Sequence, residues 1–124
     1  MAGVTVYKIL VVDDEPDLRY IMRRIFERAG HEVTAAGDGV AALQAVHRSL
    51  PDLVVTDIMM PVMGGAELIR RLRGDPLTAQ VPILAATSDT VLAGGADAVV
   101  AKPYQPVQLL TAANALLTQK AERT

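Results

Sequence analysis

Residues 8–16 read KILVVDDEP, a short apolar run that ends on an acidic pair and a proline. An apolar run without polar alternation is typical of a strand that is buried on both faces, as in a parallel sheet. Pro16 suits the first turn of a helix, where its missing N–H has no partner to lose. Apolar residues at helical spacing follow: Leu18, Ile21, Met22, Ile25, Phe26 and Ala29. Gly30 is a natural end for this helix. The stretch therefore predicts a strand and then a helix, the repeating unit of an α/β fold.

The same alternation continues along the rest of the chain. We expect further strands at residues 31–36, 53–56, 82–86 and 98–101, and helices at 40–48, around 68–72 and from 106 to 117. Alternating strands and helices with buried-strand composition predict a parallel sheet. Because crossovers between parallel strands are right-handed, helices should cover both faces of that sheet.

The length of 124 residues predicts one domain, 1–124, with a core at about 8–118 and a flexible tail at about 119–124. Hydrophobic residues make up 51% of the chain and aromatic residues only 3%, so the core should be aliphatic. The absence of cysteine excludes disulfides and thiolate chemistry. The chemistry that is left is that of carboxylates, hydroxyls and lysines.

The composition also disfavours two kinds of partner. A net charge of −2 argues against direct nucleic-acid binding through phosphate contacts. No apolar run approaches the ~18 residues that a transmembrane helix needs, and the N-terminus lacks the pattern of a signal peptide. We therefore expect a cytoplasmic protein with no membrane contact and no direct nucleic-acid contact.

Reactive side chains stand at the ends of the predicted strands: Asp13 and Asp14 after the first, Asp57 after the third, Thr87 after the fourth and Lys102 after the fifth. In open parallel sheets, ligands bind beyond the carboxyl ends of the strands. Three carboxylates placed together repel one another, and Mg²⁺, which prefers oxygen ligands, relieves that repulsion. The hydroxyl and the amine would then help to bind an anion such as a phosphoryl group.

Each of these residues also has an ordinary structural role. The acidic pair could cap the following helix, Asp57 could begin a turn, and Lys102 could be a solvated surface lysine. A shared site is favoured because each main strand ends in the residue type that the others require.

The complete pattern resembles the receiver domain of two-component response regulators, the family typified by single-domain chemotaxis receivers. The matching segments are residues 9–16, 54–65, 82–88, 95–97 and 102–104, within a likeness that runs from about Lys8 to Leu117. The resemblance implies a flavodoxin-like, doubly wound sheet of five parallel strands in the order 2-1-3-4-5.

The resemblance also implies a role for each site residue. Asp57 would accept a phosphoryl group from a histidine kinase or a histidine phosphotransfer protein, or from a small donor such as acetyl phosphate. Asp14, Asp57 and the backbone carbonyl of Met59 would bind Mg²⁺, with Asp13 reaching the cation through water. Lys102 and Thr87 would bind the phosphoryl oxygens. The Lys102–Pro103 peptide bond is typically cis in this family.

Two features depart from the family pattern. Val99 stands where most receivers have an aromatic switch residue, which puts the usual Thr–aromatic switch in doubt. Only residues 88–94 separate Thr87 from Gly95, so the fourth helix of the family must be shortened or missing. We expect this change to expose the face of the fifth strand and the last helix for an output protein or for self-association. The last helix has apolar residues on more than one side: Val107, Leu109, Leu110, Leu116 and Leu117.

Other residues near the predicted site also have candidate roles. Met59 and Asp89 flank it and could set how readily water attacks the phosphoryl group. The first helix carries Arg19, Arg23, Arg24 and Arg28. These arginines are expected to form a solvated face, with contact to a kinase or phosphotransfer partner as the alternative.

The sequence therefore predicts a phosphoacceptor that is a signalling module and not an enzyme, acting through protein contacts. Two alternatives stay open: a phosphorylation-independent pseudo-receiver scaffold, and a small Mg²⁺-dependent phosphohydrolase with Asp57 as its nucleophile. The hydrolase is the weaker of the two, because Met59 stands where it would need a second aspartate.

Overall fold

The structure, a computed structural model, describes residues 5–123 and contains one sheet of five parallel strands in the order β2-β1-β3-β4-β5. The strands are β1 (Lys8–Val12), β2 (Glu32–Ala36), β3 (Leu53–Thr56), β4 (Ile83–Thr87) and β5 (Ala98–Ala101). The helices are α1 (Pro16–Arg28), α2 (Gly39–Arg48), α3 (Gly65–Gly74) and α4 (Pro106–Arg123), with a 3₁₀ turn, η1 (Thr90–Leu92). The predicted fold class and strand order are confirmed.

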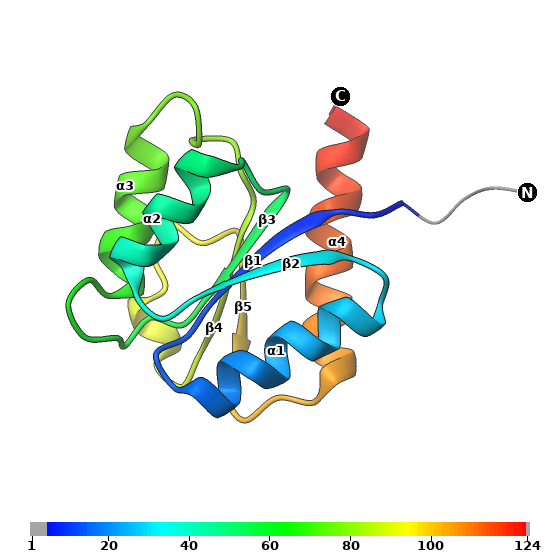
Figure 1. Cartoon of the computed structure of the whole chain (residues 1–124), viewed down its shortest axis with the longest axis horizontal. Helices are drawn as coiled ribbons and strands as arrows, with labels where there is room; N and C mark the ends of the chain where they lie inside the picture. The colour runs from blue at the N-terminus through cyan, green and yellow to red at the C-terminus, as the bar shows by residue number, and fades with distance from the viewer. Residues whose placement is uncertain (1–4, 124) are drawn as a thin grey trace, which may run out of the picture.

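Two hydrophobic cores hold the helices on opposite faces of the sheet (Figure 1). On one face, α1 and α4 pack over the strands through Phe26, Met22 and Leu109, all fully buried. On the other face, α2 and α3 supply Ala42, Leu68 and their neighbours. Aliphatic side chains from adjacent strand positions point into the two cores alternately, as expected of a sheet covered on both sides.

The strand register brings the carboxyl ends of the central strands to one edge. Val12 of β1 pairs with Thr56 of β3, and the Asp57 N–H donates to the Val12 carbonyl at 2.9 Å. The residues that follow these strands, Asp13 and Asp57, are therefore neighbours although they are far apart in the sequence. The fold places them together before any side-chain chemistry is considered.

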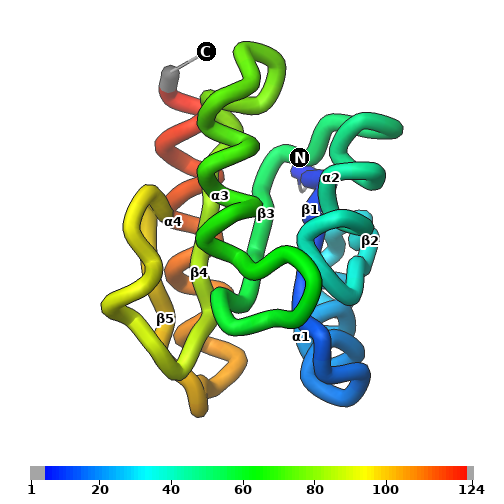
Figure 2. The backbone as a smooth tube through the Cα atoms, turned by 90° about the vertical axis from the view of Figure 1, so that its left-hand side faces the viewer, coloured from blue at the N-terminus to red at the C-terminus, as the bar shows by residue number. Residues whose placement is uncertain are grey.

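The family's fourth helix is missing, as the length of the segment predicted. Residues 88–97 connect β4 to β5 through η1 alone, and they run along the outer edge of the molecule beside β5 (Figure 2). Arg73 fixes the second half of this connection. Its guanidinium donates to the Gly95 carbonyl at 3.2 Å and to the Asp97 carboxylate at 2.7 Å. Gly95 has a φ of +92°, a conformation that L side chains rarely adopt.

Two details differ from the predictions. Ile21, expected on the buried stripe of α1, is 49% exposed, because it lies over a groove between α1 and the start of α4. The last helix continues to Arg123 and does not end near residue 117. Its final turns are held by an ion pair between Lys120 and Asp52, with Nζ 2.7 Å from Oδ1. Residues 119–123 are thus helical.

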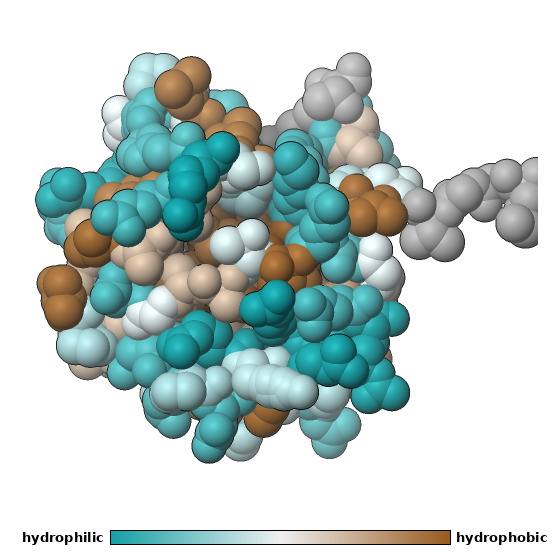
Figure 3. Space-filling view, in the orientation of Figure 1, coloured by the Kyte–Doolittle hydropathy of each residue, from teal (hydrophilic) through white to brown (hydrophobic). Residues whose placement is uncertain are grey.

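Figure 3 shows the face that carries α1, β2 and α2, and hydrophilic residues cover most of it. Within the described range, 5–123, the structure has no helix of the length and apolarity needed to cross a membrane.

Candidate functional site

Three carboxylates form a compact cluster at the carboxyl edge of the sheet. Oxygen atoms of Asp13, Asp14 and Asp57 all lie within 4.8 Å of one another. Asp13 is fully buried, Asp57 is 7% exposed and Asp14 is half-buried. Burying several carboxylates together is costly unless a positive charge compensates them.

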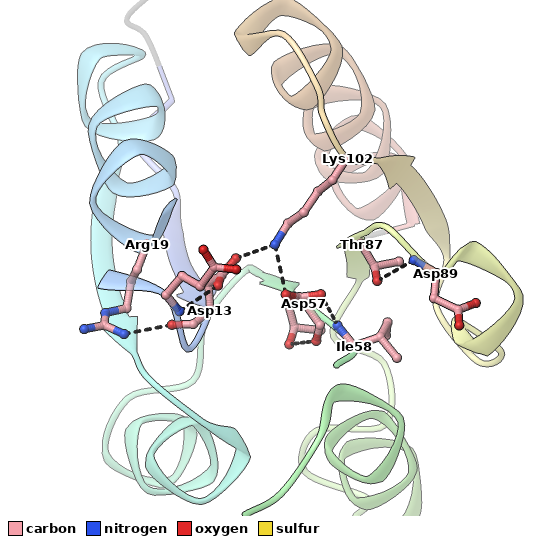
Figure 4. Close-up of polar contacts among 9 residues, drawn as sticks. Asp13, Arg19, Asp57, Ile58, Thr87, Asp89 and Lys102 are labelled. Atoms are coloured by element: carbon pink, nitrogen blue, oxygen red, sulfur yellow. Dashed lines mark hydrogen bonds and ion pairs between the residues drawn. The ribbon is translucent and has the colours of Figure 1, made fainter. Parts of the chain in front are cut away.

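Lys102 supplies one such charge. Its Nζ donates to Asp13 Oδ2 at 2.7 Å and to Asp57 Oδ2 at 2.9 Å, and so bridges the two buried carboxylates (Figure 4). Burial lowers the pKa of Lys102, but the hydrogen bonds to Asp13 and Asp57 more than offset this, and its pKa lies above the usual 10.5. The amine therefore stays charged at neutral pH. The peptide bond that follows it, Lys102–Pro103, is cis.

Asp57 is held from both sides. Its Oδ1 accepts a hydrogen bond from the Ile58 N–H at 2.7 Å, and its Oδ2 accepts from Lys102. The start of α3 approaches closely, since a Cβ on Gly65 would lie 2.1 Å from the Asp57 carbonyl oxygen. Only glycine fits there, so the sequence Gly64-Gly65 allows α3 to begin directly beside Asp57.

Thr87 ends β4 at the same edge and is fully buried. Its Oγ1 accepts a hydrogen bond from the Asp89 N–H at 3.1 Å, so the hydroxyl is turned toward its own loop. The Asp89 carboxylate points away from Asp57 (Figure 4) and accepts from the Val91 N–H at 3.2 Å. The Asp89 carboxylate therefore caps the start of η1. The sequence had suggested instead that Asp89 could affect the attack of water on a phosphoryl group.

Exposed apolar residues stand in the loop that follows Asp57 and on β5. Met59 is 59% exposed and Val62 is 87% exposed, both in the loop between β3 and α3. Val62 has a φ of +68°, which is unusual for a β-branched residue. Val99, at the position of the family's aromatic residue, is 41% exposed on β5.

Two contributors to the site were not predicted from the sequence. Arg19 was expected on a solvated face, but its Nη1 donates to the Asp13 carbonyl at 2.8 Å and so braces the acidic loop. The Tyr104 hydroxyl is buried beside Lys102 with no hydrogen-bond partner in the described residues, and burial raises the pKa of the phenol above its usual 10. Neither feature has a local sequence signal, because the surroundings of Arg19 and Tyr104 are set only by the fold.

The carboxylate cluster fits a magnesium ion. Mg²⁺ takes oxygen ligands and typically uses one or two carboxylates together with water molecules. Asp13, Asp14 and Asp57 offer that donor set within 4.8 Å, and the cation would offset the negative charge that Lys102 leaves uncompensated.

Comparison with known proteins agrees with this arrangement. The family model of the response regulator receiver domain matches residues 9–114. The chain belongs to this family. Receiver domains are signalling modules of two-component systems and not classical enzymes, and they interact with histidine kinases.

Three relatives illustrate the likeness of this receiver domain in sequence and in structure. It is 39% identical over 122 residues to the DNA-binding response regulator MtrA of Mycolicibacterium smegmatis, covering 93% of this chain and 52% of MtrA. A putative response regulator from Chloroflexus aurantiacus has a TM-score of 0.87 and 31% identity, covering 92% of this chain and 99% of that one. The response regulator TrrA of Thermotoga maritima, solved with Mg²⁺ and beryllium fluoride, has a TM-score of 0.80 and 29% identity, covering 88% of this chain and 97% of that one.

The receiver spans about half the length of the MtrA relatives. The DNA binding in their name is a property of those longer proteins.

Proposed function

We propose that this receiver accepts a phosphoryl group on Asp57 from a histidine kinase or a histidine phosphotransfer protein, with Mg²⁺, in a cytoplasmic phosphorelay. The observation that carries the proposal is the bridged acidic cluster. Asp57 is nearly buried, belongs to a cluster of three carboxylates and is bonded to a charged lysine.

The reaction follows from the contacts of Asp57. A carboxylate oxygen attacks the phosphorus of a phosphohistidine, an O–P bond forms and the N–P bond breaks, and the departing imidazole nitrogen takes up a proton. The product is an acyl phosphate on Asp57. Lys102 lies 2.9 Å from Asp57 Oδ2, so its ammonium group can pair with a phosphoryl oxygen without a large movement.

Asp14, Asp57 and the backbone carbonyl of Met59 would hold Mg²⁺ directly, and Asp13 would reach it through water. When bound, the cation would supply positive charge next to the carboxylates and the phosphoryl oxygens. Arg19 and Lys102 would keep the acidic loop in place through Asp13.

A groove between α1 and the start of α4 supports a docking position for the phosphodonor. Tyr20 and Ile21 are 56% and 49% exposed, and the groove of about 430 Å³ continues to Pro106 and Leu110. Arg28 lies at its edge. We expect Ile21→Asp to slow transfer from an autophosphorylated histidine kinase by at least tenfold, while phosphorylation by acetyl phosphate is unchanged.

The face formed by η1, β5 and the exposed side of α4 supports output through protein contacts or self-association. Asp97 and Lys102 are the only charged residues between Thr90 and Gln119, and both are ion-paired within the molecule. Val91 and Val107 are 88% and 63% exposed there. Charge depletion of this kind is typical of the core of a protein interface. Three apolar residues expected on this face belong instead to the receiver's own core: Leu109, Leu116 and Leu117.

Incubation with Mg²⁺ and acetyl phosphate, followed by intact-mass spectrometry, tests the proposal. We expect one phosphoryl adduct that is absent in Asp57→Asn and present in the matched control Asp17→Asn, which changes an exposed aspartate on α1. The absence of any adduct, with beryllium fluoride also failing to bind, contradicts the proposal and favours a scaffold. Continuous turnover of a small phosphate ester favours a hydrolase.

A further inference from the structure

All the sulfur in this receiver belongs to methionine, because the chain has five methionines and no cysteine. Three of the five fall within the loop between β3 and α3: Met59, Met60 and Met63. Met22, on α1, is fully buried. Within the described part of the chain, an oxidant that reacts with thioethers therefore finds its accessible targets in the loop that follows Asp57.

The loop between β3 and α3 is held at two places. At its base, the Gly65 N–H donates to the Ile58 carbonyl at 2.8 Å. At its tip, the Gly39 N–H at the start of α2 donates to the Met63 carbonyl at 3.0 Å. The Met63 side chain packs at the same point, since a Cβ on Gly39 would lie 2.6 Å from Met63 Cγ and 2.7 Å from its Sδ. Met63 thus docks the loop on α2 with both its backbone and its thioether.

The docked loop holds a strained residue next to this contact. Val62, directly before Met63, has a φ of +68°. A β-branched residue keeps such a conformation only where its surroundings impose it. The Val62 side chain is exposed and contributes little packing, so the neighbouring contact of Met63 with Gly39 is what holds the backbone in place. Loss of that contact would let the loop relax to another conformation.

We propose that Met63 is a site of reversible oxidation by a two-electron oxidant such as hydrogen peroxide, and that its sulfoxide releases the loop from α2. A lone pair of the sulfur attacks one peroxide oxygen, so an S–O bond forms and the O–O bond breaks. The departing hydroxide takes up the proton of the transferred oxygen and leaves as water. The sulfur is oxidised by two electrons, and the peroxide is reduced by two.

The sulfoxide releases the loop for two reasons. Its oxygen needs space beside the sulfur, and on the side of Gly39 even a methyl carbon does not fit. Met63 also packs against an apolar core, where a polar sulfoxide is costly. Release moves the tip of the loop and, with it, the backbone of Met59. The consequence for magnesium rests on the proposed function, in which the Met59 carbonyl binds the cation.

Treatment with hydrogen peroxide, followed by peptide mass mapping and amide NMR, tests the site. Met59 is 59% exposed, so it should oxidise first and leave the Gly39 amide unchanged, because its side chain lies in solvent. Met63 should follow, and Met22 should react last. Once Met63 is a sulfoxide, we expect exchange at the Gly39 amide to become about fivefold faster, the factor for losing one hydrogen bond.

Titration with magnesium chloride, followed at the Ile58 amide, measures the consequence for the cation. We expect the magnesium affinity to fall about tenfold when Met63 is oxidised, a loss typical of removing a group that orients a metal ligand. Methionine sulfoxide reductases should restore both the affinity and the slow exchange at Gly39.

Two matched pairs of variants separate the contact from general oxidative damage. Met63→Leu keeps an apolar side chain of similar volume and should abolish the response to peroxide, whereas Met60→Leu should retain it. Gly39→Ala places a Cβ against Met63 and should lower the magnesium affinity with no oxidant present, and peroxide should then add nothing. Gly74→Ala is its control, because nothing lies within 4 Å of the added Cβ.

Two results overturn the proposed site: Met63 stays reduced while Met59 is fully oxidised, or Met63 sulfoxide forms and exchange at Gly39 is unchanged. Faster exchange with an unchanged magnesium affinity overturns the link to the cation. If the reduced chain binds no magnesium, the ligation by the Met59 carbonyl is the part that fails. The Gly39 amide then still decides whether oxidation releases the loop.

Discussion

Side chains along β5 alternate between two different surroundings. Ala98 and Val100 pack against the core beneath α1 and α4, whereas Val99 is 41% exposed on the opposite face and Ala101 is exposed as well. The face covered by α1 and α4 is complete across the sheet, and the face covered by α2 and α3 stops before β5. A receiver domain can therefore lack one helix on one face and keep its acidic cluster, because the edge that carries the cluster depends on β1, β3 and the lysine after β5.

Truncating a leucine to alanine should cost far more stability on the complete face than in the shortened connection. Leu109→Ala removes a fully buried side chain and should lower the free energy of unfolding by about 2–5 kcal/mol. Leu92→Ala, in η1, should change it by less than about 0.5 kcal/mol. Urea unfolding measures both. Equal costs would show that η1 is packed as tightly as α4, and would contradict the proposed difference between the two faces.

A smaller effect is expected from the residue that secures the shortened connection. Arg73→Ala removes bonds to the carbonyls of Ala79, Val81 and Gly95 and to the Asp97 carboxylate, and we expect a loss of about 1–2 kcal/mol after allowing for partial exposure. Arg73→Lys should recover only part of it, because an ammonium cannot reach all four acceptors. Thermal unfolding gives the ranking. A cost near zero would mean that Arg73 does not secure the connection between β4 and β5.

Backbone strain is expected in the loop beside Asp57 and not in the shortened connection. The positive φ in the shortened connection belongs to Gly95, while the loop beside Asp57 places Val62 at +68°. Val62→Gly should therefore raise the free energy of unfolding by up to about 1 kcal/mol, since relief of the left-handed conformation outweighs the entropy cost of glycine. Denaturant unfolding against Val62→Ala, which keeps the strain, provides the control. A destabilised glycine variant would show that Val62 is not strained.

The smallest effect concerns the far end of the complete face, where Lys120 ties α4 to Asp52. Burial raises the pKa of Asp52, but hydrogen bonds from Lys120 and from the Lys8 N–H outweigh it, so the pKa lies below 3.8. The pair stabilises the fold above that value and is lost as the pH falls through the lowered pKa. Lys120→Met should cost about 0.5 kcal/mol at pH 7 and almost nothing near pH 2. A pH-independent cost would point to packing of the lysine stem instead.

The sequence predicted the features that depend on local pattern. Apolar runs with no alternation identified the strands, and a parallel register then required Asp13 and Asp57 to be neighbours. The short segment after Thr87 predicted the missing helix. Contacts made by long side chains could not be predicted, because Arg19 and Arg73 reach carbonyls that come near only after folding. The direction of the Asp89 carboxylate also depends on the turn that it caps.

The short connection changes the order in which the sheet can assemble. Residues 57–82 must be ordered to join β3 to β4, whereas residues 88–97 suffice to bring β5 beside β4. Loop-closure entropy grows with the logarithm of loop length, so the second closure costs about 0.8 kcal/mol less. Pairing of β4 with β5 is therefore a comparatively local event. We expect the last strand to add to the sheet soon after β4 is in place, and the Lys102 amine reaches the acidic cluster by that step.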